Sequence, residues 1–287
     1  MTDQPMVSVL MTAYNRETYI AEAIESVLAS SYTNFELIIV DDCSKDGTVE
    51  IALAFAAIDT RIKVYVNEKN LDQFPNRNKA ADYAIGYLIM FVDSDDTIQP
   101  DAIEYVVRQF SEHPTAKFST VYGQADIDKP TCMSSAECVR KHFFKSNHLH
   151  VGPGGTVIKT TYFKQIGGFP TVYGPAGDSY YNIKAACNAD VLLLPYIYFN
   201  YRIHGNQELS RKDSYLYNNY LYFESVMLLP ELPLTQKEKR KLLLNNKRQF
   251  LINSLVHLKN TGHFGKVISA YKTAGVGIKE IWAGIFQ

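Results

Sequence analysis

The chain has 287 residues, of which 46% are hydrophobic and 21% are charged, and its formal net charge is -1. This composition is typical of a globular protein with one large domain, or with one domain and an appendage, and the length is sufficient for a substantial core. Because the charge is almost balanced, the chain has no general attraction for phosphate backbones, and no nucleic-acid partner is expected.

The cysteines and the first residues bear on the compartment. The four cysteines show neither zinc-knuckle nor CxxC spacing, which predicts reduced thiols rather than a disulfide framework. Residues 1–6 lack the basic region and cleavage site of a signal peptide. No apolar run reaches the roughly 20 residues that span a bilayer. The sequence therefore predicts a cytoplasmic protein.

Strand and helix patterns alternate over the first hundred residues. Four apolar runs predict buried strands, at 7–11, 35–40, 62–66 and 88–92. Between them, apolar residues at helical spacing predict helices over 17–29, 49–57 and 76–86. This alternation predicts an α/β fold with a mostly parallel central sheet flanked by helices. Ligands bind such sheets at the carboxyl ends of the strands.

The second part of the chain is less regular. A helix is predicted over 100–110, and short strands over 118–122, 191–195 and 197–201. Glycines cluster between Gly152 and Gly177, which predicts loops and close backbone approach. From residue 213 onward the pattern is helical. We therefore predict a domain over 1–212 and a C-terminal helical region over 213–287.

Three carboxylates, Asp93, Asp95 and Asp96, follow the fourth predicted strand. Because like charges repel, such a cluster favours a bound cation or compensating hydrogen bonds. Carboxylate oxygens suit Mg²⁺ or Mn²⁺, which in turn can hold a diphosphate. The alternative is a solvated acidic turn that caps the next helix.

Three further segments suggest site chemistry. Asp42 ends the second strand, where a carboxylate can accept a hydrogen bond from a nucleobase or cap a helix. Asp178 opens a predicted helix, as a general base for an acceptor hydroxyl or as an ordinary N-cap. In the segment 201–204, Arg202 suits a phosphate and His204 suits a metal or the diphosphate, although lone residues of these types are often surface groups.

Taken in this order, the motifs resemble the family 2 glycosyltransferases, which have the GT-A fold with a Rossmann-like sheet. The resemblance extends over roughly residues 5–210 and rests on the segments 7–15, 35–48, 70–80, Asp93-Ser94-Asp95 as the DXD motif, Gly167-Gly168-Phe169, Asp178 and 201–204. It implies a nucleotide-sugar half at about 1–97 and an acceptor half at about 98–212. It also implies an inverting transfer from a nucleotide diphosphate sugar, with UDP expected, to an acceptor hydroxyl in surface polysaccharide or glycan assembly.

The resemblance implies residue roles as well. Asp178 would be the catalytic base, and Asp93, Asp95 and His204 would bind Mn²⁺ or Mg²⁺. The donor would be contacted by Thr12, Ala13, Tyr14, Asn15, Asp42, Arg77, Asn78, Asp93, Ser94 and Arg202. Three positions depart from the family pattern: Thr12 stands where the family often has Pro, Gly177 where it often has Glu, and Arg77 where it commonly has a small residue.

Two other functions stay open. One is a non-catalytic sugar-nucleotide-binding protein with the same fold. The other is a nucleotidyltransferase, which would normally show a glycine-rich basic loop where this chain has Thr12-Ala13-Tyr14-Asn15-Arg16. For the transferase, the expected acceptor is a saccharide or a lipid-linked saccharide.

The tail combines a basic stretch at 237–248 with apolar residues at helical spacing up to Phe286. Three arrangements are compatible with this pattern. The favoured one is packing on the catalytic domain, because amphipathic helices usually cover cores. The others are a homodimer contact and peripheral binding at the inner face of the plasma membrane, near a lipid-linked acceptor.

Overall fold

An eight-stranded sheet forms the centre of the protein. The structure, a computed structural model, describes residues 4–122, 127–205, 215–275 and 277. The strands are β1 (Val7–Ala13), β2 (Phe35–Asp41), β3 (Ile62–Val66), β4 (Leu88–Asp93), β6 (Ala116–Val121), β7 (Thr131–Met133), β8 (Thr156–Lys159) and β9 (Asp190–Leu194), in the order β3-β2-β1-β4-β8-β6-β9-β7. A separate antiparallel pair joins β5 (Thr97–Ile98) to β10 (Phe199–Asn200).

The sheet is mostly parallel, as the sequence predicts. Strands β3, β2, β1 and β4 pair in parallel, and so do β6 and β9. Strand β8 pairs antiparallel with both β4 and β6, and β7 pairs antiparallel with β9. The Rossmann-like half is thus continuous from β3 to β4, and β8 reverses direction where the second half begins.

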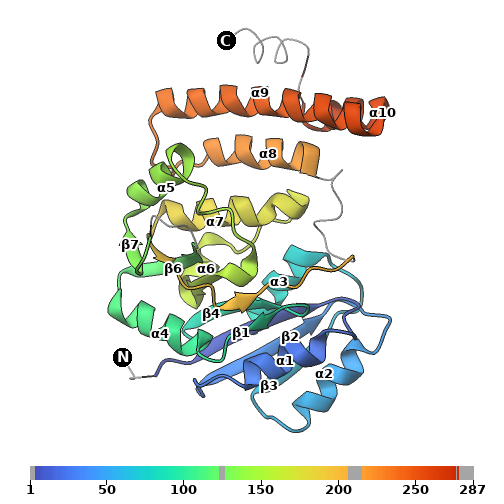
Figure 1. Ribbon diagram of the computed structural model, residues 1–287, viewed down its shortest axis with the longest axis vertical. Helices are drawn as coiled ribbons and strands as arrows, with labels where there is room; N and C mark the ends of the chain where they lie inside the picture. The colour runs from blue at the N-terminus through green and yellow to red at the C-terminus, as the bar shows by residue number, and fades with distance from the viewer. Residues whose placement is uncertain (1–3, 123–126, 206–214, 276, 278–287) are drawn as a thin grey trace.

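Alternation along the strands divides the core between the two faces of the sheet. On β1, Val7, Val9 and Met11 pack in one cluster, whereas Leu10 belongs to the other. The first cluster is covered by α1 (Ile20–Leu28), α2 (Thr48–Ala56) and α4 (Ala102–Glu112). The second lies under α3 (Gln73–Asp82), α5 (Ser135–Phe144), α6 (Thr160–Ile166) and α7 (Gly177–Cys187). Figure 1 shows α1 and α2 on one side of the strands and α3, α6 and α7 on the other.

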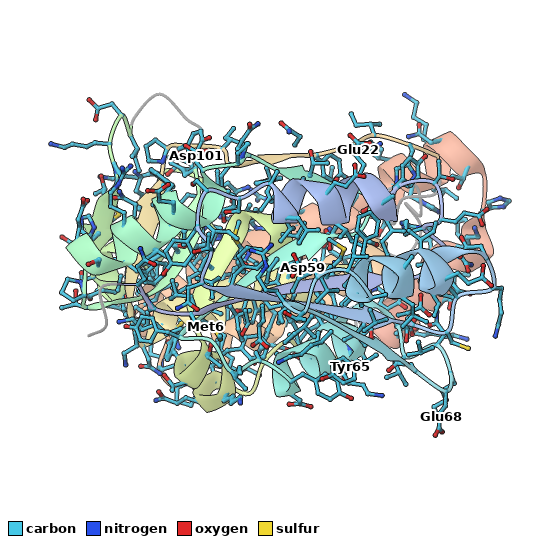
Figure 2. The ribbon with its side chains drawn as sticks, turned by 90° about the horizontal axis from the view of Figure 1, so that it is seen from below. Met6, Glu22, Asp59, Tyr65, Glu68 and Asp101 are labelled. Carbon is cyan, nitrogen blue, oxygen red and sulfur yellow. The ribbon has the colours of Figure 1, made fainter. Side chains whose placement is uncertain are left out.

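Helix α3 is held on the edge of the sheet by an aromatic pair. Tyr65 of β3 stacks on Tyr83, the residue after α3, with ring centroids 3.7 Å apart. Figure 2 views the molecule from below, with Tyr65 labelled on this edge strand and Glu68 projecting outward just beyond it. The stack fixes the helix that supplies Arg77 to the carboxyl edge.

Some predicted boundaries differ from the observed ones. Helix α3 begins at Gln73 and ends at Asp82, whereas the pattern predicted 76–86. Pro75 is tolerated in its first turn because that position needs no intrahelical N–H donor. The strand predicted over 197–201 is reduced to the two residues of β10. Helices α5 and α6 and strands β7 and β8 were not predicted.

The C-terminal helices stack above α7, one of the helices that cover the sheet. Helix α8 (Tyr215–Met227) packs on α7 and on the short turn η2 (Gly174–Ala176), and α9 (Gln236–Thr261) packs on α8. Helix α10 (Phe264–Thr273) contacts both α8 and α9. Figure 1 shows α7, α8 and α9 as successive layers above the sheet. Val226 and Leu242 join the core cluster that contains Phe91, so packing on the domain, the favoured arrangement, is observed.

Two predictions for the C-terminal region concern residues that the structure does not describe. The boundary predicted at 212–213 and the apolar residues from 278 to 286 lie outside the described residues. Within the described ranges, no helix combines the length and the apolar character that crossing a membrane requires.

Candidate active site

A cavity of about 970 Å³ lies at the carboxyl ends of β1, β2 and β4. Its wall includes most of the residues that the sequence assigned to donor and metal: Thr12, Ala13, Tyr14, Asn15, Asp42, Arg77, Asp93, Ser94 and Asp95. We call it the donor cavity. Segments separated by eighty residues converge there because the parallel strands end at a common edge.

Two residues that line this cavity, Asn15 and Asp72, and Cys43, which follows the lining residue Asp42, are non-glycine residues with left-handed backbone. Asn15 has φ 53°, Cys43 has φ 67° and Asp72 has φ 72°. The conformation of Asn15 is maintained by two hydrogen bonds, since its N–H donates to Ser44 Oγ (2.8 Å) and its Oδ1 accepts from Lys45 N–H (2.8 Å). Such backbone is costly and is concentrated at ligand sites. The rim of the cavity is therefore built for binding rather than for stability.

Asp42 is buried, and among the described residues only one of its two carboxylate oxygens accepts hydrogen bonds. Its Oδ1 accepts from Asn67 Nδ2 and from Leu71 N–H, both at 2.8 Å. Among the described residues, no hydrogen bond reaches its Oδ2, which leaves that oxygen able to accept from a nucleobase N–H. Asn67 also donates to Asn76 Oδ1 (2.9 Å), which locks the carboxylate to α3. Neither Asn67 nor Asn76 was expected from the sequence to have a role in the site.

Arg77 places a cation in the same cavity. It projects from α3, its side chain is 9% exposed, and it forms an ion pair with Asp93 at the end of β4. A second contact, from its Nη1 to Gln73 O (3.2 Å), fixes the guanidinium against its own helix. Arg77 therefore offers a fixed positive charge where a diphosphate would lie.

Asp95 joins two distant segments through one oxygen. Its Oδ2 accepts from Arg16 Nε at 3.0 Å and lies 2.9 Å from His204 Nε2. The His204 ring stacks on Tyr19, with centroids 4.7 Å apart. Arg16 is not among the expected site residues, although it directly follows the predicted nucleotide loop. The structure brings Asp95 and His204 together as expected.

The donor set fits a divalent cation held partly by substrate. Adjacent ligands of an octahedral ion at 2.0–2.1 Å stand about 3 Å apart, close to the 2.9 Å between Asp95 Oδ2 and His204 Nε2. In the part of the chain that the structure describes, no three His, Cys, Asp or Glu side chains form a metal-binding group, and Asp93 is engaged by Arg77. Mg²⁺-type ions commonly take only one or two protein ligands and complete their shell with phosphates and water.

Asp96 and Arg202 brace the acidic turn. Asp96 is buried, which raises its pKa to about 7, and its Oδ1 accepts from Arg202 N–H at 2.9 Å. Arg202 Nε donates to Asp95 O (3.0 Å), and its guanidinium pairs with Glu22 (2.7 Å). Arg202 is not among the residues that line the donor cavity. Its contacts fix the turn, whereas the sequence assigned it to the donor.

Asn78 also lies apart from the cavity lining. Its Nδ2 donates to Phe169 O (2.9 Å), and its Oδ1 accepts from Phe169 N–H (2.8 Å). A Cβ on the neighbouring Gly168, at φ 66°, would lie 2.5 Å from Asn78 Oδ1. These two hydrogen bonds join α3 to the loop after α6, and the close approach of Asn78 explains why a glycine precedes Phe169.

Asp178 lies in the first turn of α7 and faces a second cavity of about 610 Å³. Burial raises its pKa to about 6, against the opposing effects of the Ser179 hydrogen bonds and of Arg77. Its Oδ1 accepts from Ser179 N–H at 2.6 Å. Pro175 lines both cavities and so forms part of the wall between them. The proposed base thus sits beside the donor cavity rather than inside it.

The absence of Glu at position 177 has a steric cause. A Cβ built on Gly177 would lie 2.6 Å from Phe74 Cε2. Phe74 is buried and stacks on Phe169, with centroids 5.2 Å apart. The aromatic ring therefore occupies the space that a side chain at 177 would need.

Solved structures share this fold. The structure of Staphylococcus aureus TarS residues 1–349 in complex with UDP-GlcNAc aligns with a TM-score of 0.74 at 22% identity, over 92% of this chain and 79% of that chain. The mannosyltransferase PcManGT from Pyrobaculum calidifontis, in complex with GDP-Man and Mn²⁺, aligns with a TM-score of 0.65 at 18% identity, over 97% of this chain and 78% of that one. At these identities the likeness concerns the fold.

Curated relatives match in sequence. TuaG of Bacillus subtilis (strain 168), named provisionally as a teichuronic acid biosynthesis glycosyltransferase, is 40% identical over 119 residues, which are 42% of this chain and 47% of TuaG. The Escherichia coli protein named UDP-Glc:alpha-D-GlcNAc-diphosphoundecaprenol beta-1,3-glucosyltransferase WfgD is 37% identical over 125 residues, 44% of this chain and 47% of WfgD. The chain thus matches about half the length of each.

A family model covers more of the chain than either alignment. The model described as glycosyl transferase family 2 matches residues 8–165, from the first residues of β1 to the end of α6. The match includes the strand-end aspartates and the donor cavity's α3 wall, and it stops before Asp178. The chain belongs to glycosyl transferase family 2.

Proposed function

We propose that the protein is an inverting, metal-dependent glycosyltransferase that moves a sugar from a UDP-sugar to an acceptor hydroxyl. The observation that supports this most directly is the position of Asp178. It lies across Pro175 from a cavity that already contains Asp42, Arg77 and Asp95. A base on one side of a donor site is the arrangement that direct displacement requires.

Each end of the donor has a matching group. The free oxygen of Asp42 would accept from the base N–H, and Tyr14, which lines the same cavity and is 44% exposed, is available for stacking. Arg77 lies in the wall where the diphosphate would run, and Asp95 with His204 would bind Mn²⁺ or Mg²⁺. When that ion is bound, the chemistry it supplies is compensation of the negative charge that develops on the diphosphate.

The reaction needs one base. The acceptor oxygen forms a bond to the anomeric carbon while the bond from that carbon to the diphosphate oxygen breaks. The acceptor proton passes to Asp178, and the nucleoside diphosphate leaves. Arg77 stays at a fixed place in the donor wall and adds positive charge beside the leaving group. Because attack occurs opposite the leaving group, an α-linked donor yields a β-glycoside.

Relatives support the substrate class. The name of WfgD gives UDP-Glc as its donor and a diphosphoundecaprenol-linked saccharide as its acceptor, and the TarS structure contains UDP-GlcNAc. We therefore assign a UDP-sugar to this chain, and a saccharide or lipid-linked saccharide as acceptor, in polysaccharide assembly. Because the PcManGT structure contains GDP-Man, GDP-sugars serve as the comparison in the binding test described next.

The test is a panel of UDP- and GDP-sugars, each measured by thermal unfolding with and without Mn²⁺. At least one UDP-sugar should raise the unfolding temperature only when Mn²⁺ is present. No stabilisation by any nucleotide sugar would reject the donor assignment. A non-catalytic sugar-nucleotide-binding protein would show stabilisation but no slow hydrolysis of that donor, so hydrolysis measured in the same samples separates the two functions.

Exposed residues of the C-terminal helices support the proposal that the protein is cytoplasmic and binds the inner face of the plasma membrane. Helices α9 and α10 expose five large apolar side chains: Ile252, Leu255, Val256, Phe264 and Ile268. Lysines lie among them in the sequence, including Lys259 and Lys266. Exposed apolar groups flanked by cations favour an anionic membrane surface. A second copy of this chain is the competing occupant of that face.

A further inference from the structure

The cavity that Asp178 faces is closed on its outer side by the C-terminal helices. It has a volume of about 610 Å³, within the usual range of small-molecule sites. Asp178 and Ser179 of α7 lie on one side, and residues of α8 and α9 lie on the other. The tail is therefore part of the wall next to the proposed base.

The lining is rich in neutral hydrogen-bonding groups. Six carboxamides line the cavity: Asn147, Asn219, Asn245, Asn246, Gln249 and Asn253. Aromatic side chains, including Tyr222 and Phe250, lie between them. Among the described lining residues there is no Lys or Arg, and Asp178 is the only carboxylate. His142 and His150 are buried, and burial lowers the pKa of both, so they add no positive charge near neutral pH.

This lining selects a class of ligand. A carboxamide both donates and accepts hydrogen bonds, which matches the hydroxyl groups of a sugar, and an aromatic ring packs against its apolar face. A phosphate or carboxylate ligand would need cations, which the lining lacks. The chemistry of the cavity therefore fits a neutral saccharide.

The base is oriented from the same cavity. Ser179 Oγ lies 3.3 Å from Asp178 Oδ1 and 3.3 Å from His150 Nδ1. His150 Nε2 in turn lies 3.3 Å from the Tyr222 hydroxyl of α8. These contacts hold Asp178 Oδ1, and no hydrogen bond from the described residues reaches Oδ2. A hydroxyl of a ligand in this cavity can thus meet a carboxylate oxygen that has no other partner.

We propose that this cavity is the acceptor subsite and that it binds a neutral saccharide between α7 and the tail helices α8 and α9. The proposal rests on the proposed function for the role of Asp178. It goes beyond that function by naming the charge class of the acceptor and by assigning part of its recognition to residues outside the family match, which ends at 165.

The variants for the test are on α9. Asn245, Gln249 and Asn253 are exposed, and Gln249 donates one hydrogen bond to Asn253 (2.8 Å). Replacing the three together by Ala therefore preserves the core and favours the helix. The matched control is Asn260→Ala, which removes an exposed carboxamide from the same helix but outside the cavity.

The probes are neutral p-nitrophenyl hexosides and disaccharides, with hexose 6-phosphates as the charged comparison, and binding is measured by saturation-transfer difference NMR. At least one neutral glycoside should give a signal with the wild type and the control, and about tenfold less affinity with the triple variant. Wild-type binding of no neutral glycoside, equal binding by the triple variant, or preference for the phosphates would each overturn the proposal. If a neutral glycoside binds as expected but no UDP-sugar does, the proposed function is rejected, whereas saccharide binding in this cavity is not.

Discussion

His204 Nε2 lies 2.9 Å from Asp95 Oδ2, the same oxygen that accepts a hydrogen bond from Arg16. The two residues are separated by 109 positions in the chain, and the short β5–β10 pair brings their segments together. One carboxylate oxygen is thus shared by a cation and an imidazole. A divalent ion at this position would compete directly with Arg16.

Replacing Asp95 should abolish the metal dependence of donor binding. In Asp95→Ala, the oxygen proposed as principal metal ligand is lost, so the gain in UDP-sugar affinity on adding Mn²⁺ should disappear in isothermal calorimetry. Asp82→Ala removes an exposed carboxylate at the end of α3 and serves as the control. An unchanged Mn²⁺-dependent affinity in Asp95→Ala would remove this residue from the metal site.

Replacing Asp178 should separate chemistry from binding. Asp178→Asn keeps the shape of the side chain but cannot accept the acceptor proton, so kcat should fall by about 10²–10⁴-fold. Donor affinity, measured by calorimetry with Mn²⁺, should stay within about twofold of wild type, because Asp178 does not line the donor cavity. Turnover at the wild-type rate would exclude Asp178 as the base.

The pH profile of transfer should reflect the same group. Burial raises the pKa of Asp178 to about 6, and only the deprotonated carboxylate can act as a base. We expect kcat/KM to rise about tenfold per pH unit below pH 6 and to level off above it. A profile that is flat between pH 5 and 7, with chemistry shown to be rate-limiting, would contradict this assignment.

The folding stability of the protein should change with pH in the opposite direction to the rate of transfer. The folded-state pKa of Asp178 is above its ordinary value of 3.8, so the folded protein binds the proton more firmly than the unfolded chain does. Its contribution is therefore lost as pH rises from about 4 to about 6. Asp178→Asn should be more stable than wild type at pH 8 and similar to it at pH 4, by thermal unfolding. Asp96, with its raised pKa of about 7, is present in both proteins and cancels in the difference.

The contact between Gly177 and Phe74 can be tested by rescue. Gly177→Ala places a methyl group 2.6 Å from Phe74 Cε2 and should lower the free energy of unfolding by about 1–3 kcal/mol. In the double variant with Phe74→Leu, the smaller side chain leaves room for the methyl group. Chemical denaturation of the four proteins gives the coupling energy, and strictly additive losses would show that the two positions do not compete for space.

Membrane binding by the tail can be tested by flotation with anionic vesicles. Leu255→Asn combined with Phe264→Asn removes side chains that are 58% and 62% exposed on α9 and α10. The wild type should float and the double variant should not. Ile85→Asn, which changes an apolar side chain 70% exposed on the catalytic domain, should float like the wild type. A wild type that stays at the bottom of the gradient in monomer form would count against both a membrane and a second copy as occupants of this face.

The first half of the fold could be predicted because each strand there is a continuous apolar run. The ranges for β3 and β4 agree with the structure to within a residue. Strand β8 could not be predicted in the same way, since its four residues lie in a glycine-rich stretch with no distinct period. Its antiparallel direction is set by pairing with β4 and β6, which is tertiary information.

The site was predictable only where the chain order fixes geometry. Asp42 and Asp93 follow parallel strands, so their meeting at one edge follows from topology. The roles of Asn67 and Arg16 depend on side-chain contacts across elements, which no local pattern encodes. The resemblance assigns Asn78 and Arg202 to the donor, whereas Asn78 bonds the backbone of Phe169, and the partners of Arg202 include the Asp95 backbone and the Asp96 and Glu22 carboxylates.

Helix α7 is shared between two environments, with the sheet-side core on one flank and α8 on the other. Of the described residues that line the donor cavity, none belongs to α9, whereas α9 forms part of the wall of the second cavity. Under the proposed assignment of the second cavity to the acceptor, exchange of the tail among related chains is expected to alter which alcohol is glycosylated and to leave the choice of activated sugar unchanged. Acceptor preference and donor preference could then evolve separately.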